Sequence, residues 1–197
     1  MTLSDRDIKR YIKEGKIKIK PKPNFKEQLG PCSLDLHLGN VFKVFKPSQY
    51  PYLDPKREIN FEEIMEEIKI DNGSPFILQP KDFVLTTTKE EVSLSDNLMA
   101  RLDGRSSLAR LGVIIHVTSA RFDPGWTGRA VLELGNLGTM PVVLYAGVTR
   151  ICSLSFEILS SPADIPYWKK KGQKYAEAKY PQASKLNMEL KKQKSKD

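Results

Sequence analysis

The sequence of 197 residues contains no hydrophobic run that approaches the ~18 residues of a membrane-spanning helix. Its first residues, Met1-Thr2-Leu3-Ser4-Asp5, lack the apolar stretch of a secretory signal. We therefore expect a cytoplasmic protein that has no membrane partner.

Cysteine and histidine are scarce as well, and the chain holds only Cys32, Cys152, His37 and His116. No Cys-x-x-Cys or His-x-x-x-His spacing is present, so a structural zinc site is not expected. Both cysteines lie in segments where apolar residues alternate with polar ones. This pattern predicts that both are buried free thiols.

Acidic residues are fewer than basic ones, 24 against 32, which gives a formal net charge of +8. Much of the excess lies between Lys13 and Lys26 and in residues 185–197. A basic protein attracts anions, which include nucleotides and nucleic acids. However, no aromatic–glycine RNA-binding signature accompanies the lysines, so we interpret them as solubilising charge and expect no nucleic-acid partner. A non-catalytic basic module that binds nucleotides or nucleic acids is the remote alternative.

Thirteen prolines and twelve glycines interrupt the sequence often, which favours many short strands over long helices. Ser4 can begin a first helix that Gly15 ends. Asn60 can begin a second helix, whose apolar residues at helical spacing are Phe61, Ile64, Met65 and Ile68.

Strands are expected wherever apolar and polar residues alternate between turn signals. The expected strands span residues 17–20, 32–38, 41–45, 76–78, 83–87, 98–102, 113–117, 130–134, 142–144 and 151–158. This spacing indicates a mainly β fold, an antiparallel-rich sandwich or barrel. We expect one domain over residues 1–184, with little regular core structure after Pro162, and a mobile basic tail over residues 185–197.

One short segment concentrates groups that bind phosphate: Gly104-Arg105-Ser106-Ser107-Leu108-Ala109-Arg110. Ser106 and Arg110 stand four residues apart, so on a helix they share a face, while Leu108 and Leu111 can anchor the other side. A helix start also offers free backbone N–H groups and a positive dipole end. The segment is therefore a candidate polyphosphate site, although an ordinary capped turn into a helix has the same residues.

Two carboxylates further along the chain are candidates for chemistry. Asp123 precedes Pro124-Gly125, so it can either bind a sugar hydroxyl or cap its own β-turn. Glu133 lies among apolar residues of an expected strand. It can face solvent, or it can occupy a half-buried pocket, where desolvation would raise its pKa and suit it to general acid–base work.

Taken together, these segments resemble the dCTP deaminase branch of the dUTPase-like family. The resemblance covers most of the chain and follows the family's order of motifs. Its parts are Leu3-Ser4-Asp5-Arg6-Asp7-Ile8, Pro31-Cys32-Ser33-Leu34-Asp35-Leu36-His37-Leu38-Gly39, the stretch from Leu102 to Gly112, the stretch from His116 to Trp126, Val131-Leu132-Glu133, and Ser161-Pro162-Ala163-Asp164 with Pro166-Tyr167.

The resemblance implies a dUTPase-like distorted β-barrel or jelly-roll with a few short helices, assembled as a homotrimer with active sites between subunits. It implies that Arg105, Ser106, Ser107, Leu108, Ala109 and Arg110 bind the triphosphate. It further implies that Asp123 holds the deoxyribose, that Val131 and Leu132 contact the cytosine through their backbone, and that Glu133 is catalytic. Tyr167 and Lys174 are implied to close over the triphosphate, Mg²⁺ to bind through the nucleotide, and dTTP to act as an inhibitor.

These roles lead to a hypothesis of hydrolytic deamination of dCTP to dUTP and ammonia, a step of pyrimidine deoxynucleotide metabolism. The zinc-deaminase signature His-x-Glu with Pro-Cys-x-x-Cys is absent, so Glu133 would act as general base without zinc. Arg110 and Ser106 would orient the water and stabilise the tetrahedral adduct.

The chain departs from the family pattern at two places. Ala178 stands where relatives often have a glutamine, so one hydrogen bond on the phosphate side is either missing or supplied by a neighbour such as Gln182. Ser119-Ala120-Arg121 matches neither the deaminase-only pattern nor the bifunctional pattern fully, although Arg121 and Trp126 favour the former. The alternative is therefore a bifunctional enzyme that releases dUMP and pyrophosphate, or a simple dUTP diphosphatase, with Asp123 activating the water.

Overall fold

The computed structural model describes residues 1–197 except 48–49, 58, 172–174, 176–177, 189 and 191–197. Its helices are α1 (Asp5–Lys13), α2 (Phe25–Gln28), α3 (Phe61–Ile64), α4 (Ser106–Ala109) and the 3₁₀ turn η1 (Tyr167–Lys169). Its strands are β1 (Ile17–Lys20), β2 (Ser33–Phe45), β3 (Met65–Lys69), β4 (Pro75–Leu78), β5 (Phe83–Leu94), β6 (Leu98–Gly104), β7 (Val113–Ile114), β8 (Arg121–Phe122), β9 (Thr127–Asn136), β10 (Val142–Tyr145) and β11 (Arg150–Ile158). The predicted mainly β fold with a few short helices is therefore confirmed.

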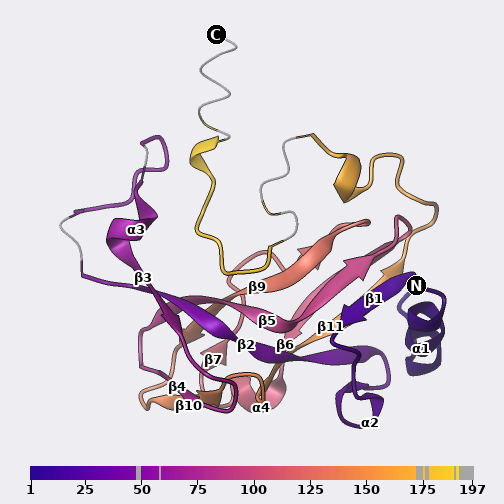
Figure 1. Cartoon of the computed structure of the whole chain (residues 1–197), viewed down its shortest axis with the longest axis horizontal. Helices are drawn as coiled ribbons and strands as arrows, with labels where there is room; N and C mark the ends of the chain where they lie inside the picture. The colour runs from indigo at the N-terminus through magenta and orange to yellow at the C-terminus, as the bar shows by residue number, and fades with distance from the viewer. Residues whose placement is uncertain (48–49, 58, 172–174, 176–177, 189, 191–197) are drawn as a thin grey trace.

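The strands form a nine-stranded sheet in the order β7-β9-β5-β2-β11-β6-β8, and every ladder in it is antiparallel. Strand β1 adds to β5, strand β3 adds to β2, and β4 with β10 makes a separate two-stranded sheet. The strands twist strongly about one another, as Figure 1 shows. Neighbouring strands on this path are not consecutive in the sequence, so the connections carry the chain between strands that do not pair with each other.

Strand β2 links the two halves of the sheet. Its first part pairs with β11, and its second part pairs with β3 and β5, with an irregularity between Leu38 and Phe42. Gly39 lies in this irregularity, and a Cβ there would come within 2.6 Å of the Thr87 carbonyl oxygen. Only glycine lets the two backbones approach this closely, so the change of pairing partner depends on that residue.

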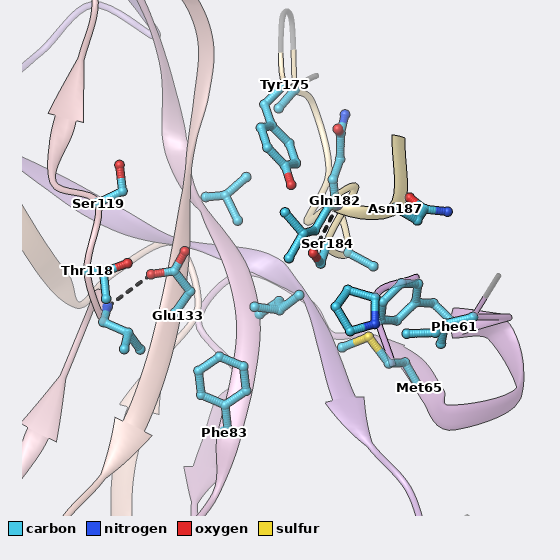
Figure 2. A pocket seen from close by; sticks show the side chains of 18 of the residues that line it. Phe61, Met65, Phe83, Thr118, Ser119, Glu133, Tyr175, Gln182, Ser184 and Asn187 are labelled. Carbon is cyan, nitrogen blue, oxygen red and sulfur yellow. Dashed lines mark hydrogen bonds between the residues drawn. The ribbon is translucent and has the colours of Figure 1, made fainter. Parts of the chain in front are cut away.

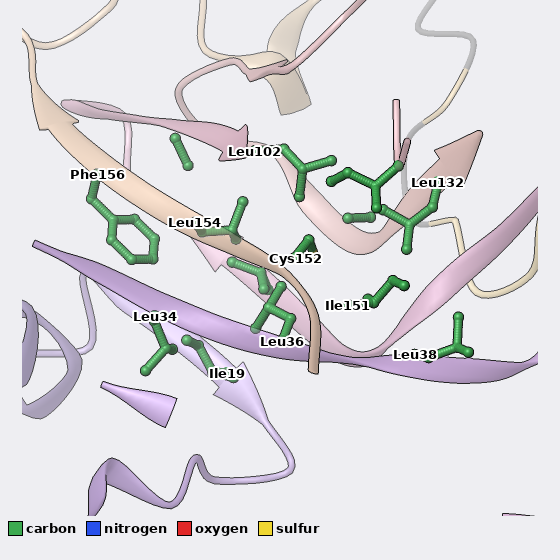
Figure 3. Packing of buried hydrophobic residues seen from close by; sticks show 14 of the residues in the cluster. Ile19, Leu34, Leu36, Leu38, Leu102, Leu132, Ile151, Cys152, Leu154 and Phe156 are labelled. Atoms are coloured by element: carbon green, nitrogen blue, oxygen red, sulfur yellow. The ribbon is translucent and has the colours of Figure 1, made fainter. Parts of the chain in front are cut away.

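The core lies on the inner face of the strands, where alternate residues of β2, β6, β9 and β11 meet (Figure 3). Leu34, Leu36 and Leu38 are fully buried, in agreement with the alternation expected for this strand. Burying a side chain of this size is worth about 1.5–3 kcal/mol. Cys152 lies in the same core, and burial raises the pKa of its thiol well above the ordinary value.

The first helix begins as predicted. The Ser4 side chain accepts a hydrogen bond from the Asp7 backbone N–H, Ile8 and Tyr11 are buried, and Gly15 follows the end of the helix with a positive φ of 74°. Figure 1 shows α1 beside β1 at one side of the sheet. The helix therefore covers the edge that β1 forms.

Some expectations were wrong, among them the strand expected over residues 113–117, which ends at Ile114. The helix after Asn60 ends at Ile64, and Met65–Lys69 is strand β3, because these residues pair with Val41–Phe45 of β2. The burial expected for Cys32 is also wrong, because the chain bends at Pro31-Cys32 before β2 begins at Ser33 and leaves Cys32 exposed. Among the residues that the structure describes, no helix is long and apolar enough to cross a membrane.

The described residues after Pro162 form little regular structure, as expected, but Tyr167 and Ala178 are held against the sheet. The Tyr167 N–H donates to the Pro124 carbonyl at 2.7 Å, and the Arg129 N–H donates to the Ala178 carbonyl at 2.8 Å. Ala178 is buried. Most of the expected tail over residues 185–197 lies outside the described residues, so its mobility stays a prediction.

Candidate active site

A cavity of about 800 Å³ opens between β9, the 117–126 segment, α3 and the C-terminal segment. One wall is polar and includes Glu133, Thr118, Ser119 and Asp123. The apolar side chains of Phe61 and Met65 lie across the cavity from Glu133, and Phe83 lies below Glu133, as Figure 2 shows. A pocket of this size with one apolar wall and few convergent polar groups suits a ring that carries polar substituents.

Glu133 projects into this cavity because strand alternation separates it from its buried neighbours. Leu132 and Leu134 point into the core, whereas Val131 and Glu133 lie on the pocket face and are half-buried. The Val117 backbone N–H donates to Glu133 Oε2 at 3.0 Å, and the Glu133 N–H donates to the Ile115 carbonyl at 3.0 Å. These two bonds fix both the strand and the direction of the carboxylate (Figure 2).

Asp123 sits in the predicted β-turn, in which the Trp126 N–H donates to the Asp123 carbonyl at 3.1 Å. Its carboxylate does not cap that turn. Instead, Arg121 Nε donates to Asp123 Oδ1 at 3.1 Å. Both side chains line the cavity, so the ion pair forms part of the polar wall.

The C-terminal segment closes one side of the cavity through Tyr167, Tyr175, Ala178 and Gln182. The Tyr175 hydroxyl accepts a hydrogen bond from the Lys185 N–H at 3.0 Å. Gln182 lies on the cavity wall, and its role in place of the glutamine that Ala178 replaces stays a prediction. Lys174, which was expected to bind the triphosphate, lies outside the described residues.

The expected phosphate segment forms α4, which follows the extended residue Arg105. Arg110 Nη1 donates to the Ser106 carbonyl at 3.0 Å, so these two residues share one side of the short helix. Leu108 packs against the core, whereas Leu111 is 56% exposed and does not anchor the helix. None of the helix residues is buried, which leaves Ser106 and Ser107 accessible.

The structure divides the predicted site residues into two groups. Asp123, Val131, Glu133 and Tyr167 line one cavity, and Leu132 lies beneath it with only its backbone available. The other group does not line that cavity and consists of Arg105, Ser106, Ser107, Leu108, Ala109 and Arg110. Figure 1 places α4 at the lower edge of the sheet, whereas the C-terminal segment beside the cavity runs along the upper edge.

Sequence reasoning did not find the apolar wall of the cavity or the ion pair between Arg121 and Asp123. Only the spacing of Arg121 and Asp123 could have signalled their ion pair, because residues two apart in an extended chain point to the same side. Within the described part of the chain, no group of three or more His, Cys, Asp or Glu side chains is arranged to hold a metal ion.

Comparison with known proteins identifies the family of the chain. A family model described as dCTP deaminase-like matches residues 2–159. The chain belongs to the dCTP deaminase-like family. The family resemblance inferred from the motifs is thereby confirmed.

Relatives in the dCTP deaminase-like family align over nearly the whole chain. A protein of Thermomicrobium roseum named dCTP deaminase is 53% identical over 190 residues, covering 96% of both chains. A protein of Dictyoglomus thermophilum named "dCTP deaminase, dUMP-forming" is 52% identical and covers 96% of this chain and 97% of its own. A third, from Methanobrevibacter smithii and with the same name as the second, is 48% identical over 193 residues, covering 96% of this chain and 98% of its own.

The crystal structure of 2'-deoxycytidine 5'-triphosphate deaminase from Agrobacterium tumefaciens shares the fold. Its TM-score is 0.62 at 23% identity, and the alignment covers 80% of this chain. Only 48% of that chain is covered, so the present chain spans about half of its length.

Proposed function

We propose that this protein hydrolyses dCTP to dUTP and ammonia, with Glu133 as the general base. The observation that carries the proposal is the fixed, half-buried carboxylate of Glu133 facing a cavity with one apolar wall. The names of relatives that are about half identical over 96% of the chain support the choice of dCTP. The enzyme class is a hydrolase that acts on the C–N bond of a cyclic amidine.

Glu133 first removes a proton from a water molecule as the oxygen of that water attacks C4 of the cytosine ring. The resulting adduct carries both a hydroxyl and the amino group on C4. The first proton passes to ring N3, and Glu133 then moves the hydroxyl proton of the adduct to the amino nitrogen, so that the C4–N4 bond breaks and ammonia leaves as the C4 carbonyl forms. General acid–base help of this kind is typically worth about 10²–10⁴-fold in rate.

The other residues of the cavity hold the nucleoside. Backbone groups of Val131 and Leu132 contact the cytosine edge, and Asp123 accepts a hydrogen bond from the deoxyribose hydroxyl. Tyr167 and Lys174 close over the phosphates. Holding base and sugar on rigid strand β9 and a tight turn fixes C4 relative to Glu133, which lowers the entropic cost of the attack.

Further contacts with the triphosphate would come from α4 of a second copy of the chain. In a homotrimer, α4 of one subunit would face the cavity of its neighbour, and its Arg105, Ser106, Ser107 and Arg110 would bind the phosphates. Arg110 and Ser106 would also orient the attacking water and stabilise the adduct. This arrangement explains why one chain holds the two groups of residues apart.

Mg²⁺ fits the site as a partner of the nucleotide, because phosphate oxygens are the hard ligands that it prefers. When bound, it neutralises part of the triphosphate charge. The described residues offer no cluster of three or more ligands that would hold it by themselves. Glu133 acts on the water without zinc in this proposal.

A second candidate function is a bifunctional reaction that releases dUMP and pyrophosphate. The relatives named as dUMP-forming, at 52%, 50% and 48% identity, favour it. In that case Asp123 would activate a second water molecule against the α-phosphorus. Inhibition by dTTP, a cytoplasmic location and the lack of nucleic-acid binding stay predictions.

Product analysis distinguishes these functions. Purified protein incubated with dCTP and Mg²⁺ should release ammonia, and chromatography should show dUTP as the accumulating nucleotide. Accumulation of dUMP with pyrophosphate would assign the bifunctional reaction instead. Absence of ammonia, together with salt-sensitive binding of oligonucleotides, would refute both and support a non-catalytic basic module.

A further inference from the structure

The side chain of Arg105 is held by groups from two other strands. Its Nε lies 3.3 Å from Asp35 Oδ2 on β2, and its Nη1 donates to the Arg150 carbonyl on β11 at 3.2 Å. Arg150 Nη1 also lies 3.3 Å from Asp35 Oδ2 and donates to the Glu27 carbonyl. The Asp35 carboxylate therefore forms ion pairs with two guanidinium groups, those of Arg105 and Arg150.

Strand register explains why Asp35 reaches Arg105. Strand β11 lies between β2 and β6, and Ser153 of β11 pairs with Asp35 on one side and with Asp103 of β6 on the other. Arg105 follows β6 directly, so its side chain turns back across the outer face of the same three strands. The Asp35 side chain is 17% exposed and that of Arg105 is 30% exposed, which shields their ion pair partly from solvent.

The backbone beneath Asp35 is fixed as well. Gln28 of α2 is buried, and its Nε2 donates to the Asp35 carbonyl at 2.9 Å and to Glu90 Oε1 at 3.1 Å. Asp35 is thus a fixed anion, and its ion pair with Arg105, together with the hydrogen bond from Arg105 to the Arg150 carbonyl, orients the Arg105 guanidinium group.

We propose that Asp35 is a positioning residue that fixes the Arg105 guanidinium for contact with the substrate phosphates, an inference that rests on the proposed function. The two contacts use Nε and Nη1 and engage no Nη2 donor; among the described residues, none accepts a hydrogen bond from Nη2. Arg105 therefore presents a donor edge whose orientation is set before the nucleotide arrives, which lowers the entropic cost of binding.

Electrostatics and positioning predict opposite effects of removing this carboxylate. If Asp35 acted only through its charge, its loss would make the phosphate site more positive and would tighten binding of a triphosphate. If it positions Arg105, its loss frees a long side chain and weakens binding. The sign of the change in KM for dCTP therefore separates the two.

The experiment measures kcat and KM for dCTP in Asp35→Asn. We expect KM to rise about tenfold with kcat within about twofold, because an interaction with the phosphates contributes to binding in both the ground state and the transition state. The matched control is Asp103→Asn, which removes the same charge from the same register row; no described residue pairs with the Asp103 side chain. Its KM should stay unchanged or fall slightly.

A double-mutant cycle with Arg105→Ala tests whether Asp35 acts through Arg105. Asp35→Asn should have no further effect on KM in the Arg105→Ala background. An undiminished effect there, a lowered KM in Asp35→Asn, or a fall in kcat alone would each overturn the proposal. If Asp35→Asn does not fold, Asp35→Glu takes its place in the same cycle, because its longer side chain displaces the carboxylate.

The controls also distinguish failure of the proposed role of Asp35 from failure of the proposed function, dCTP deamination. Wild-type turnover of dCTP with a raised KM in Arg105→Ala but a normal KM in Asp35→Asn would refute the role of Asp35 alone. Lack of dCTP turnover by the wild-type protein would refute the proposed function, and the role of Asp35 with it.

Discussion

At the scale of single residues, two glutamates show how surroundings separate a structural carboxylate from a reactive one. Glu90 is 2% exposed and accepts hydrogen bonds from Gln28 Nε2 and the His37 N–H, with His37 Nδ1 2.7 Å away. Glu133 is half-buried and accepts one, from the Val117 N–H at 3.0 Å, while no described residue donates to its Oε1. Protein groups contact both carboxylate oxygens of Glu90, whereas Oε1 of Glu133 is left available for a substrate.

Replacing Glu133 by glutamine tests its role as a base. The amide can still accept the Val117 N–H bond, so we expect the fold and dCTP binding to persist while ammonia release falls about 10²–10⁴-fold. Steady-state ammonia release and binding of dCTP by calorimetry measure the two effects.

Glu157→Gln is the matched control, since it removes the same charge from β11 at a residue that does not line the cavity. It should retain turnover. Near-normal turnover in Glu133→Gln would show that another group is the base.

At the scale of elements, the turn at residues 123–126 connects the nucleoside site to the C-terminal segment. Gly125 has a positive φ of 79°, and a Cβ there would lie 2.3 Å from the Trp168 ring and 2.9 Å from Pro166. The Tyr167 N–H donates to the Pro124 carbonyl of the same turn. The close approach that glycine permits therefore places Tyr167 on the cavity wall.

Gly125→Ala should destabilise the protein and raise KM for dCTP by displacing Tyr167. The backbone strain of alanine at positive φ costs about 1–2 kcal/mol, and overpacking adds about 1–3 kcal/mol. For a chain of this size each kcal/mol lowers Tm by about 2–4 °C. Circular-dichroism melting at fixed protein concentration measures the change.

Gly73→Ala provides the comparison, because Gly73 has a φ of 88° but a Cβ added there would meet no atom within 4 Å. Its Tm should fall only by the backbone contribution, and its KM should not change. Equal losses in the two variants would show that contact with Trp168 contributes nothing.

At the scale of the whole molecule, the separation of α4 from the Glu133 cavity is the main finding. Under the proposed function, a site assembled from both would draw them from different subunits, because residues 105–110 do not line the cavity of their own chain. In a closed homotrimer each subunit would supply the cavity of one site and the phosphate segment of the next. Each subunit would then take part in two sites.

Mixed assemblies test this arrangement. Glu133→Gln and Arg110→Ala should each be nearly inactive alone, yet co-expression in equal amounts should restore activity. Random assembly joins an intact cavity to an intact phosphate segment in about one quarter of the sites, so about one quarter of wild-type activity is expected. Ammonia release from doubly tagged, purified mixtures provides the measurement.

The control mixture combines Ser106→Ala with Arg110→Ala. Both changes fall in the same half of the site, so every α4 carries one of them and no activity should return. Failure of the Glu133→Gln and Arg110→Ala mixture to recover activity, despite confirmed co-assembly, would assign both halves of the site to one chain.

Local pattern was enough to predict some parts of this protein. The Ser4 cap, the turn at Asp123, and the alternation that sends Leu132 inward and Glu133 outward all depend on residues within a few positions of one another. Strand and helix periodicity express such short-range geometry directly. The motifs around these residues also identified the family.

Long-range pairing decided the rest. Met65–Lys69 became a strand because β2 lies beside it, and Asp35 meets Arg105 only because β11 brings β2 and β6 together. The distance between α4 and Glu133 likewise follows from the order of strands in the sheet. The sequence by itself determined which side chains can perform the chemistry, because residue type and local alternation are written in it. Only the tertiary structure decided which of them share a cavity, because strand pairing joins residues that are remote along the chain.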